Sequence, residues 1–361
     1  MKCVQSNKLD FSGQNIYVGI DVHLRSWSVA ILSDHSVLKR FSQNPEPEAL
    51  HKYLVSNYPG ANYFSVYEAG FCGFWIHERL TDLGITNIVV NPSDVPTMSK
   101  EKLRKTDAVD CNKLARELRS GSLVGIYVPG VETLELRSLI RMRNLIVKDS
   151  TRAKNRIKSL LRFHGVDIPE EFTRCSIGCW SKRFLSWLQA LELSTEYGKK
   201  TLGLHLEQFI RLRMMLLQET RAIREISRKA PFEKPIRLLT SVPGIGVTTA
   251  ATLMVELDDI ARFKNSDRLA SFIGLIPMCH SNGESNGTGD ITVRRHFMLR
   301  CLLVEAAWIA IRKDPAMTLA YTEYRKRMSP QKSIIKIARR LVNRIYYVLK
   351  HEKEYVPCVV Q

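Results

Sequence analysis

Short apolar runs separated by polar residues dominate the first third of the chain. The runs are rich in Val, Ile and aromatic residues, which is typical of strands, while longer stretches with a period of about 3.6 residues indicate helices. The predicted strands cover residues 16–22, 26–32, 36–41, 63–68 and 88–92, and the predicted helices cover residues 47–57, 74–83 and 107–120. Consecutive strands followed by alternating helices and strands predict an α/β domain with the element order of the ribonuclease-H fold.

The pattern turns helical over residues 132–163, without an obvious break. Nine Arg or Lys residues stand there against three Asp or Glu residues, opposite an apolar face. A solvated polar face, a face that binds nucleic acid and a dimerising coiled coil all fit this composition. Residues 170–230 also show a mostly helical pattern, most clearly over 209–227, and residues 230–235 are expected to form a linker.

From residue 236 the sequence predicts two helices joined by a tight turn at Gly244-Ile245-Gly246. Glycines allow backbone amides to approach a phosphate closely, and the positive end of the second helix begins there. This is the signature of a helix-hairpin-helix that contacts the DNA backbone, and an ordinary corner between two helices is the alternative. Gly244 and Gly246 are therefore candidate nucleic-acid-binding residues.

A long polar stretch follows at residues 279–295, between apolar helices predicted over 269–273 and 299–311. Such a Gly, Ser and Asn loop held between packed helices is often functional. The last predicted helix, residues 333–350, is amphipathic and basic, and eleven basic residues stand against three acidic ones between residues 313 and 353. We expect Lys336, Arg339 and Arg340 in this helix to contact nucleic acid.

The composition fits a globular protein with a polyanionic partner. The chain has 361 residues, 45% hydrophobic and 25% charged, with a formal net charge of +18. This length allows two or three domains, and such an excess of positive charge most often indicates nucleic acid, although a merely soluble basic protein is the alternative. Eight scattered cysteines suit a reducing cytoplasm, and no signal peptide or membrane-spanning run is expected.

Four carboxylates are the strongest candidates for chemistry: Asp21, Glu68, Asp107 and Asp110. The first two end predicted strands, and the other two lie three residues apart on one helix face. Close carboxylates repel each other unless cations intervene, and oxygen ligands are those that Mg²⁺ or Mn²⁺ prefers. Two such ions about 4 Å apart could stabilise the entering and leaving oxygens of a phosphodiester exchange. Any single acid could instead be a surface charge, and Asp107 could cap its helix.

The motifs around these acids resemble those of the DEDD transposases of the insertion-sequence "one-ten" family, which includes the Piv-type DNA invertases. The motifs are Gly-Ile-Asp-Val-His, Tyr-Glu-Ala-Gly, Lys-Thr-Asp-Ala-Val-Asp, Val-Pro-Gly-Ile-Gly and Ile-Gly-Leu-Ile-Pro, in the family's order. The resemblance implies a RuvC-like DEDD domain over residues 1–130, a helical coiled-coil region over 131–235 and a mostly helical C-terminal transposase domain over 236–361. It also implies that the four acids hold the metal.

The family resemblance further implies a recombinase with a serine nucleophile, guided by a structured bridge RNA that pairs with target and donor double-stranded DNA. Family members assemble as dimers of dimers, and an active site can combine the acids of one subunit with the serine of another. We therefore expect a homodimer that forms a tetramer. We also expect a prokaryotic cytoplasmic protein, associated with the nucleoid when it is bound to DNA.

The candidate nucleophile implied by the resemblance is Ser281, in the polar stretch after Gly-Leu-Ile-Pro. The family usually has Ser-Ser-Gly or Gln-Ser-Gly there, whereas this chain has Ser281-Asn282-Gly283, so Ser285 is a weaker alternative. Arg294 and Arg295, in a second altered motif, could steady a phosphate or contact only the DNA backbone. Two other functions stay open: a RuvC-like structure-selective endonuclease that uses water, and a nucleic-acid-binding protein without catalysis.

Overall fold

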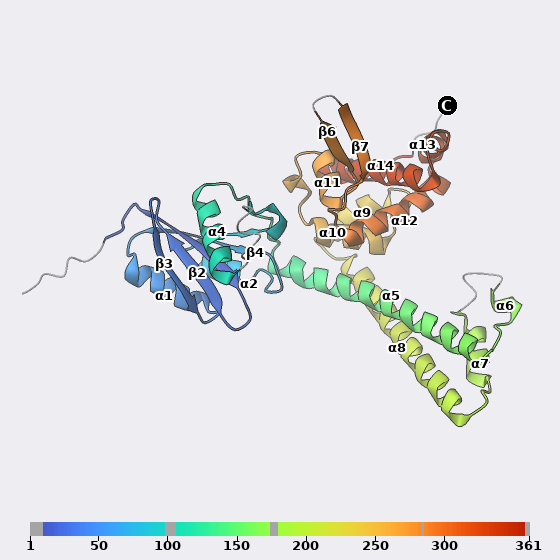
Figure 1. The fold of residues 1–361 in the computed structure, drawn as a ribbon. Helices are drawn as coiled ribbons and strands as arrows, with labels where there is room; N and C mark the ends of the chain where they lie inside the picture. Colours follow the sequence, from blue (N-terminus) through green and yellow to red (C-terminus); the bar gives the residue numbers. More distant parts are fainter. Residues whose placement is uncertain (1–9, 98–105, 174–179, 283–284, 358–361) are drawn as a thin grey trace, which may run out of the picture. The chain divides into compact units, whose positions relative to one another are not determined.

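The computed structural model describes residues 10–97, 106–173, 180–282 and 285–357. The chain divides into two compact units, Met1–Val128 and Pro129–Gln361 (Figure 1). The first is a mixed α/β unit and the second is mostly helical, so the predicted combination of an α/β part with a helical part is confirmed. The RuvC-like assignment and the further division at residue 235 stay predictions.

A five-stranded sheet forms the centre of the first unit. Its strands are β1 (Asn15–Val22), β2 (Trp27–Leu32), β3 (Val37–Gln43), β4 (Asn62–Glu68) and β5 (Thr86–Val90). Their order is β3-β2-β1-β4-β5, in which β1 to β3 are antiparallel while β4 pairs parallel to β1 and β5 parallel to β4. The five predicted strands are confirmed, although β5 ends at Val90, before Pro92, which has no amide hydrogen for a ladder.

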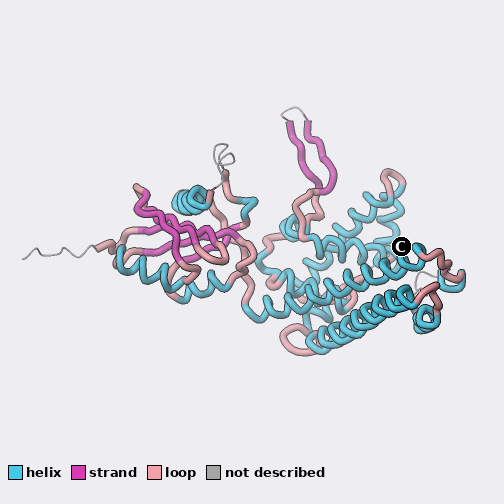
Figure 2. Tube along the Cα trace, turned by 60° about the horizontal axis from the view of Figure 1, so that its bottom comes forward, coloured by secondary structure: helices cyan, strands magenta, loops and turns pink. Residues whose placement is uncertain are grey.

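Helices cover both faces of this sheet (Figure 2). The helices are α1 (Pro47–Asn57), α2 (Trp75–Asp82) and α4 (Asp107–Arg119), as the sequence predicts. On one face, apolar side chains of β1 such as Ile16, Val18 and Ile20 share a buried cluster with α1 and α2. On the other face, α4 packs against β1 and β2.

The contact between β1 and α4 depends on Gly19. A Cβ atom at this position would lie 2.1 Å from the carbonyl oxygen of Cys111 and 2.5 Å from the amide nitrogen of Ala115, both in α4. Real side chains do not tolerate such distances to backbone atoms, so only glycine lets the helix lie this close to the strand. The close approach fixes α4 above the end of β1.

Two long helices, α5 (Val131–Phe163) and α8 (Glu196–Ile226), lie side by side in the second unit (Figure 1). Two short helices, α6 (Glu170–Thr173) and α7 (Lys182–Ala190), connect them and share an apolar cluster that includes Leu161, Phe184 and Phe209. The helix predicted over 209–227 begins earlier, at Glu196. Gly198 and Gly203 weaken the local helical signal of this first part, but its Leu202 and Leu206 are buried against the neighbouring helices.

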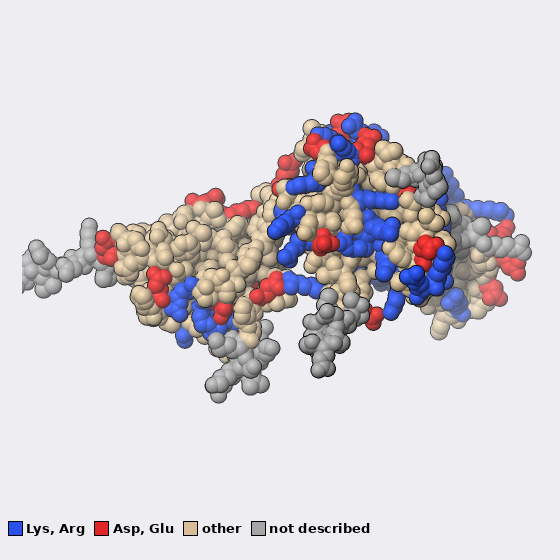
Figure 3. Space-filling view, turned by 90° about the horizontal axis from the view of Figure 1, so that it is seen from above, with Lys and Arg blue, Asp and Glu red and all other residues tan. Residues whose placement is uncertain are grey.

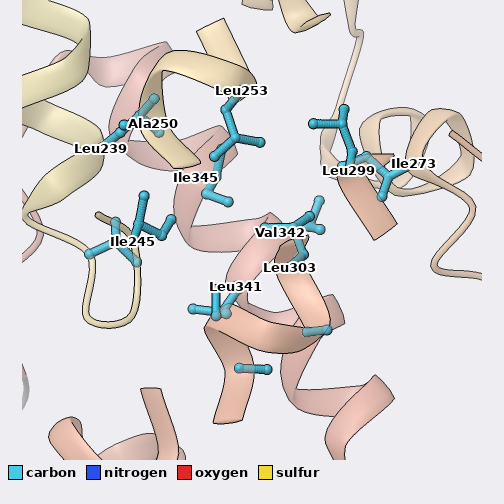
Figure 4. Close-up of a cluster of buried hydrophobic side chains, with 14 of the residues drawn as sticks. Leu239, Ile245, Ala250, Leu253, Ile273, Leu299, Leu303, Leu341, Val342 and Ile345 are labelled. Atoms are coloured by element: carbon cyan, nitrogen blue, oxygen red, sulfur yellow. The ribbon is translucent and has the colours of Figure 1, made fainter. Parts of the chain in front are cut away.

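The remaining helices enclose the largest apolar core. They are α9 (Glu233–Thr240), α10 (Val247–Leu257), α11 (Ser266–Ile273), α12 (Phe297–Lys313), α13 (Pro315–Arg325) and α14 (Pro330–His351). Figure 4 shows Leu303 from α12 beside Leu341, Val342 and Ile345 from α14. Buried positions recur along α14 with helical spacing, which confirms the predicted amphipathic helix.

The expected linker at 230–235 is wrong in its second half, because α9 already begins at Glu233. Pro235 lies in the first turn of that helix, where an amide hydrogen has no intrahelical partner, so it does not prevent helix formation. The buried side chains of Ile236 and Leu239 anchor α9 in the core.

The expected polar loop at 279–295 is also wrong in part. Residues Pro277–Asn282 form strand β6 and residues Ser285–Ile291 form strand β7, an antiparallel hairpin in which Ser281 pairs with Asn286. Gly, Asn and Ser have low strand propensity, so the pattern of apolar and polar residues in the sequence did not indicate this hairpin. Only two residues connect the strands, a length typical of hairpins.

A buried carboxylate, Glu256, ties three helices of the second unit together. This α10 side chain is 2% exposed and accepts two hydrogen bonds of 2.8 Å from Arg141 of α5, with Arg137 Nε 3.4 Å away. His296 Nε2 lies 3.2 Å from the same carboxylate, while its Nδ1 accepts the amide hydrogen of Leu299 at the start of α12. The ring is therefore protonated at Nε2 and donates to Glu256.

This network lowers the pKa of Glu256. Burial alone would raise it, but hydrogen bonds from His296 and Arg141 outweigh burial and bring the pKa to about 2. A carboxyl group with a depressed pKa stabilises the fold above its unfolded pKa, and this contribution disappears as pH falls towards the folded value. The contribution, on the order of 3 kcal/mol, is complete above about pH 5 and lost between there and pH 2.

We expect Glu256→Gln to destabilise the protein by on the order of 3 kcal/mol at pH 7, because Arg141 keeps its charge without a carboxylate. The difference from wild type should shrink as pH falls from 5 to 2. Urea unfolding at several pH values measures it, with Glu305→Gln, an exposed change on α12, as the control. A difference that does not change with pH would contradict this role.

A second prediction concerns Gly19. Gly19→Ala should destabilise the first unit by about 1–3 kcal/mol, since the added methyl group pushes α4 away from β1. Hydrogen exchange in α4 should quicken at the same time. The matched control is Gly203→Ala in α8, where an added Cβ meets nothing within 4 Å and helix propensity predicts a gain in stability. Equal effects of the two substitutions would show that the close approach does not matter.

Candidate active site

The four predicted acids meet at one edge of the sheet. Ile20 of β1 pairs with Tyr67 of β4 in a parallel register, so Asp21 and Glu68 follow at adjacent positions. Asp107 and Asp110 occupy the first turn of α4, which packs on the same part of β1. Since Gly19 and Asp21 alternate onto the same face of the strand, the Asp21 side chain faces α4.

A histidine lies between Asp21 and Asp107. His23 Nε2 is 3.3 Å from Asp21 Oδ2 and 3.4 Å from Asp107 Oδ2. These three residues each offer one ligand atom, and the atoms all lie within 4.8 Å of one another. From the sequence we assigned no role to His23. Its spacing of two residues from Asp21 was a signal, because it puts both side chains on one side of an extended chain.

A lysine lies between Glu68 and Asp110. Lys113 Nζ is 3.4 Å from Asp110 Oδ1 and 3.9 Å from Glu68 Oε1, and its side chain is only 8% exposed. Lys113 was missed from the sequence as well. A signal was present, because Asp107, Asp110 and Lys113 are spaced by three residues and so lie near one another on one face of α4.

The electrostatics of the site differ from those of an ordinary surface. Partial burial raises the pKa of Asp21, and the neighbouring charges of Asp107 and Asp110 raise it further, while His23 acts in the opposite direction. The raised pKa of Asp21 thus reflects burial first, and then repulsion from the two neighbouring carboxylates. A divalent cation relieves such repulsion, and the oxygen and imidazole donors of Asp21, Asp107 and His23 fit Mg²⁺ or Mn²⁺.

The capping alternative for Asp107 finds no support. Thr106 is the N-cap of α4, and the Asp107 carboxylate points to His23. The site is therefore built from the ends of two parallel strands and the first turn of the helix that crosses them.

The predicted nucleophile belongs to the second unit. The backbone of Ser281 lies in β6, and Ser285 begins β7, where it pairs with Asn282. The side chains of residues 279–288 lie outside the described part of the structure. After the hairpin, the Arg295 guanidinium lies over the ring of Phe297 at 5.5 Å, and the Arg294 amide donates to Thr292 Oγ1.

The two glycines of the predicted helix-hairpin-helix have different surroundings. Gly244 has a φ of +94°, and a Cβ there would lie 2.3 Å from the Ala306 carbonyl oxygen of α12. Packing against α12 therefore accounts for glycine at this position. Gly246 precedes α10 with open space around it, so the expected contact with a phosphate rests on Gly246 and the first amides of α10.

The three predicted cationic residues of α14 also differ from one another. Lys336 and Arg340 lie over the ring of Tyr324 at 5.2 and 5.4 Å, and Arg340 Nε donates to the Tyr324 hydroxyl. Arg339 forms an ion pair with Asp267, which offsets part of its charge. Lys336 and Arg340 are thus the better candidates of the three for contact with a polyanion.

Lys and Arg side chains gather on the face of the second unit that Figure 3 displays. On this unit, α5, α10 and α12 line a groove of about 870 Å³. Four cationic residues line it: Arg141, Arg143, Lys148 and Arg295. Among the helices that the structure describes, we find none with the length and apolar character needed to cross a membrane.

Two family models match the chain. A transposase model of the DEDD and IS110 type matches residues 18–165, which include all four acids. A model described as the transposase IS116/IS110/IS902 family matches residues 236–322, which include the hairpin and the Gly244 turn. The first match covers most of the first unit and continues through α5 of the second, and the other match lies wholly in the second unit.

Several relatives carry transposase names. The putative transposase y4qE of Sinorhizobium fredii is 29% identical over 67% of this chain and 57% of its own length. The transposase for insertion sequence element IS1533 of Leptospira borgpetersenii is 25% identical over 82% of this chain and 85% of its own length. The transposase for IS1111A of Coxiella burnetii is 27% identical over 67% of this chain and 64% of its own length.

The chain therefore spans less than two thirds of the first and third of these relatives and most of the second. Both matching models describe transposases of the IS110/IS116 type, and the relatives carry transposase names, so the chain is similar to the IS110/IS116 DEDD transposases in both of its units.

Proposed function

We propose that this protein cuts and rejoins DNA strands in transposition, with divalent metal held in the acid cluster beside the phosphate. The observation that carries this proposal is the convergence of Asp21, Glu68, Asp107 and Asp110, from three separate elements, on one edge of the five-stranded sheet. Carboxylates gathered in a chain of net charge +18 are well suited to phosphodiester chemistry.

Within this site, Asp21, His23 and Asp107 are the residues that would hold Mg²⁺ or Mn²⁺. When bound there, the ion supplies positive charge at a phosphoryl oxygen and lowers the pKa of an attacking hydroxyl. The protein fixes the geometry through the contact between Gly19 and α4, and it keeps Asp21 partly shielded from water. Such preorganised charge is worth more where water is partly excluded.

We further propose that Ser281 is the nucleophile. Its Oγ attacks the phosphorus, the P–O bond to the departing DNA strand breaks, the serine proton passes to solvent, and the departing oxygen takes a proton from solvent. The phosphoserine bond replaces one phosphodiester by another, so no ATP is needed. Attack by a DNA hydroxyl on the phosphoserine reverses the step, rejoins a strand and frees the serine.

The partners we propose are a structured bridge RNA, target and donor double-stranded DNA, and further copies of the chain in a dimer of dimers. The family resemblance supports the RNA and the assembly, and the groove between α5, α10 and α12, with its four Lys and Arg residues, supports a polyanion on the second unit. Phosphate contacts of this kind position a nucleic acid, while a guide RNA supplies sequence through base pairing. The cytoplasm and the bacterial nucleoid are the proposed location.

Asp21→Asn should lower DNA cutting by on the order of 100-fold or more, because the site loses a metal-holding carboxylate. Supercoiled plasmid carrying donor and target sequences, with the element's own RNA added, measures cutting. Asp82→Asn at the end of α2 changes one acid of the same unit away from the site and serves as the control. Equal activity of the two variants would favour a binding protein without catalysis.

Ser281→Ala should abolish both strand transfer and the covalent protein–DNA adduct that denaturing gels detect. Ser285→Ala should keep both, because Ser285 is the weaker candidate. If wild type cuts DNA but never forms an adduct, and Ser281→Ala cuts equally well, the protein is a RuvC-like endonuclease that uses water. An adduct that disappears only in Ser285→Ala would move the nucleophile to that residue.

A further inference from the structure

The two halves of the acid cluster are not equivalent. In one half, His23 stands between Asp21 and Asp107, and in the other Lys113 stands between Glu68 and Asp110. A neutral imidazole has a nitrogen lone pair and can be a metal ligand. An ammonium group has three donors and no acceptor, so it cannot.

Burial fixes Lys113 in its place. Its side chain is 8% exposed, whereas that of Glu68 is 34% and that of Asp110 21% exposed. Lysine is rarely buried unless its charge is paired, because desolvation of an ammonium group is costly. Two carboxylates within 4 Å supply that pairing, so removing the ammonium from its place between Glu68 and Asp110 would cost the fold part of its stability.

The same position is the one that a second metal ion would need. A divalent ion shared by Glu68 and Asp110 must approach both carboxylates to about 2.1 Å. Lys113 Nζ already lies 3.4 and 3.9 Å from these oxygens. Its positive charge repels a cation at this distance, and it takes up the carboxylate charge that would otherwise attract one.

We propose that the ammonium group of Lys113 is the built-in cation of the Glu68–Asp110 half, so that this site takes up one divalent ion, at Asp21, His23 and Asp107, and not two. Lys113 is a positioning residue in this arrangement, since it orients Glu68 and Asp110 without contacting the phosphate. The inference rests on the proposed metal-dependent function, and it differs from the two-ion arrangement that four acids alone would suggest.

The test counts Mn²⁺ ions bound to the full chain without DNA, by titration calorimetry and by electron paramagnetic resonance. Wild type and Lys113→Arg should bind one ion. Lys113→Met keeps the length of the apolar stem but removes the charge, and it should bind two ions, with the spectrum of a coupled Mn²⁺ pair about 4 Å apart. The double variant Lys113→Met/Glu68→Gln should return to one ion.

Lys39→Met is the matched control, because it removes one exposed lysine of the same unit, on β3, away from the acids. It should bind one ion. Two ions on wild type would overturn the inference even if Lys113→Met failed to fold, and a folded Lys113→Met that binds only one ion would overturn it as well. Failure of the proposed function looks different, because a wild-type protein that binds no Mn²⁺ would contradict the metal site itself.

Discussion

The direct contact of α4 with β1 at Gly19 is the constraint on which the candidate site depends. A helix normally lies far enough from a sheet for side chains to fill the space between them, but here the backbone of α4 would collide with even one methyl group at Gly19. This proximity brings the first turn of α4 to the end of β1. Because Gly19 and Asp21 lie on the same face of the strand, the residue that admits the helix also determines which carboxylate the helix meets.

Two clusters of charge in the protein show how surroundings decide the role of an acid. Glu256 is deeply buried, but two arginines and a histidine surround it, and its pKa falls to about 2. Such a carboxylate is fully partnered and serves the fold. Burial raises the pKa of Asp21, and the nearby carboxylates of Asp107 and Asp110 raise it further, although His23 acts in the opposite direction. A bound cation would relieve the repulsion between these close carboxylates. Acids whose pKa is perturbed in this way are characteristic of functional sites.

Much of the first unit could be predicted from sequence, because its strands are short apolar runs and its acids end those runs. The ends of α1 were predicted to the residue, since Pro47 marks a helix start and Pro59-Gly60 follows shortly after Asn57. The features that the sequence did not reveal depend on contacts between residues far apart in the chain. His23 and Lys113 acquire meaning only once β1, β4 and α4 meet, and the β6–β7 hairpin is held by backbone pairing among residues with little strand propensity. The helix α8 begins earlier than predicted because Leu202 and Leu206 are buried against neighbouring helices. Local helix propensity does not reveal this burial.

We propose above all that the end of β1 and the first turn of α4 form one divalent metal site. The most direct measurement is diffraction from crystals grown with Mn²⁺, recorded at the manganese absorption edge so that the ion is located by its anomalous scattering. We expect an anomalous peak within coordination distance of the carboxylates of Asp21 and Asp107 and of the His23 ring. A fully ordered site without a peak, or a peak only at acids elsewhere in the chain, would contradict the claim.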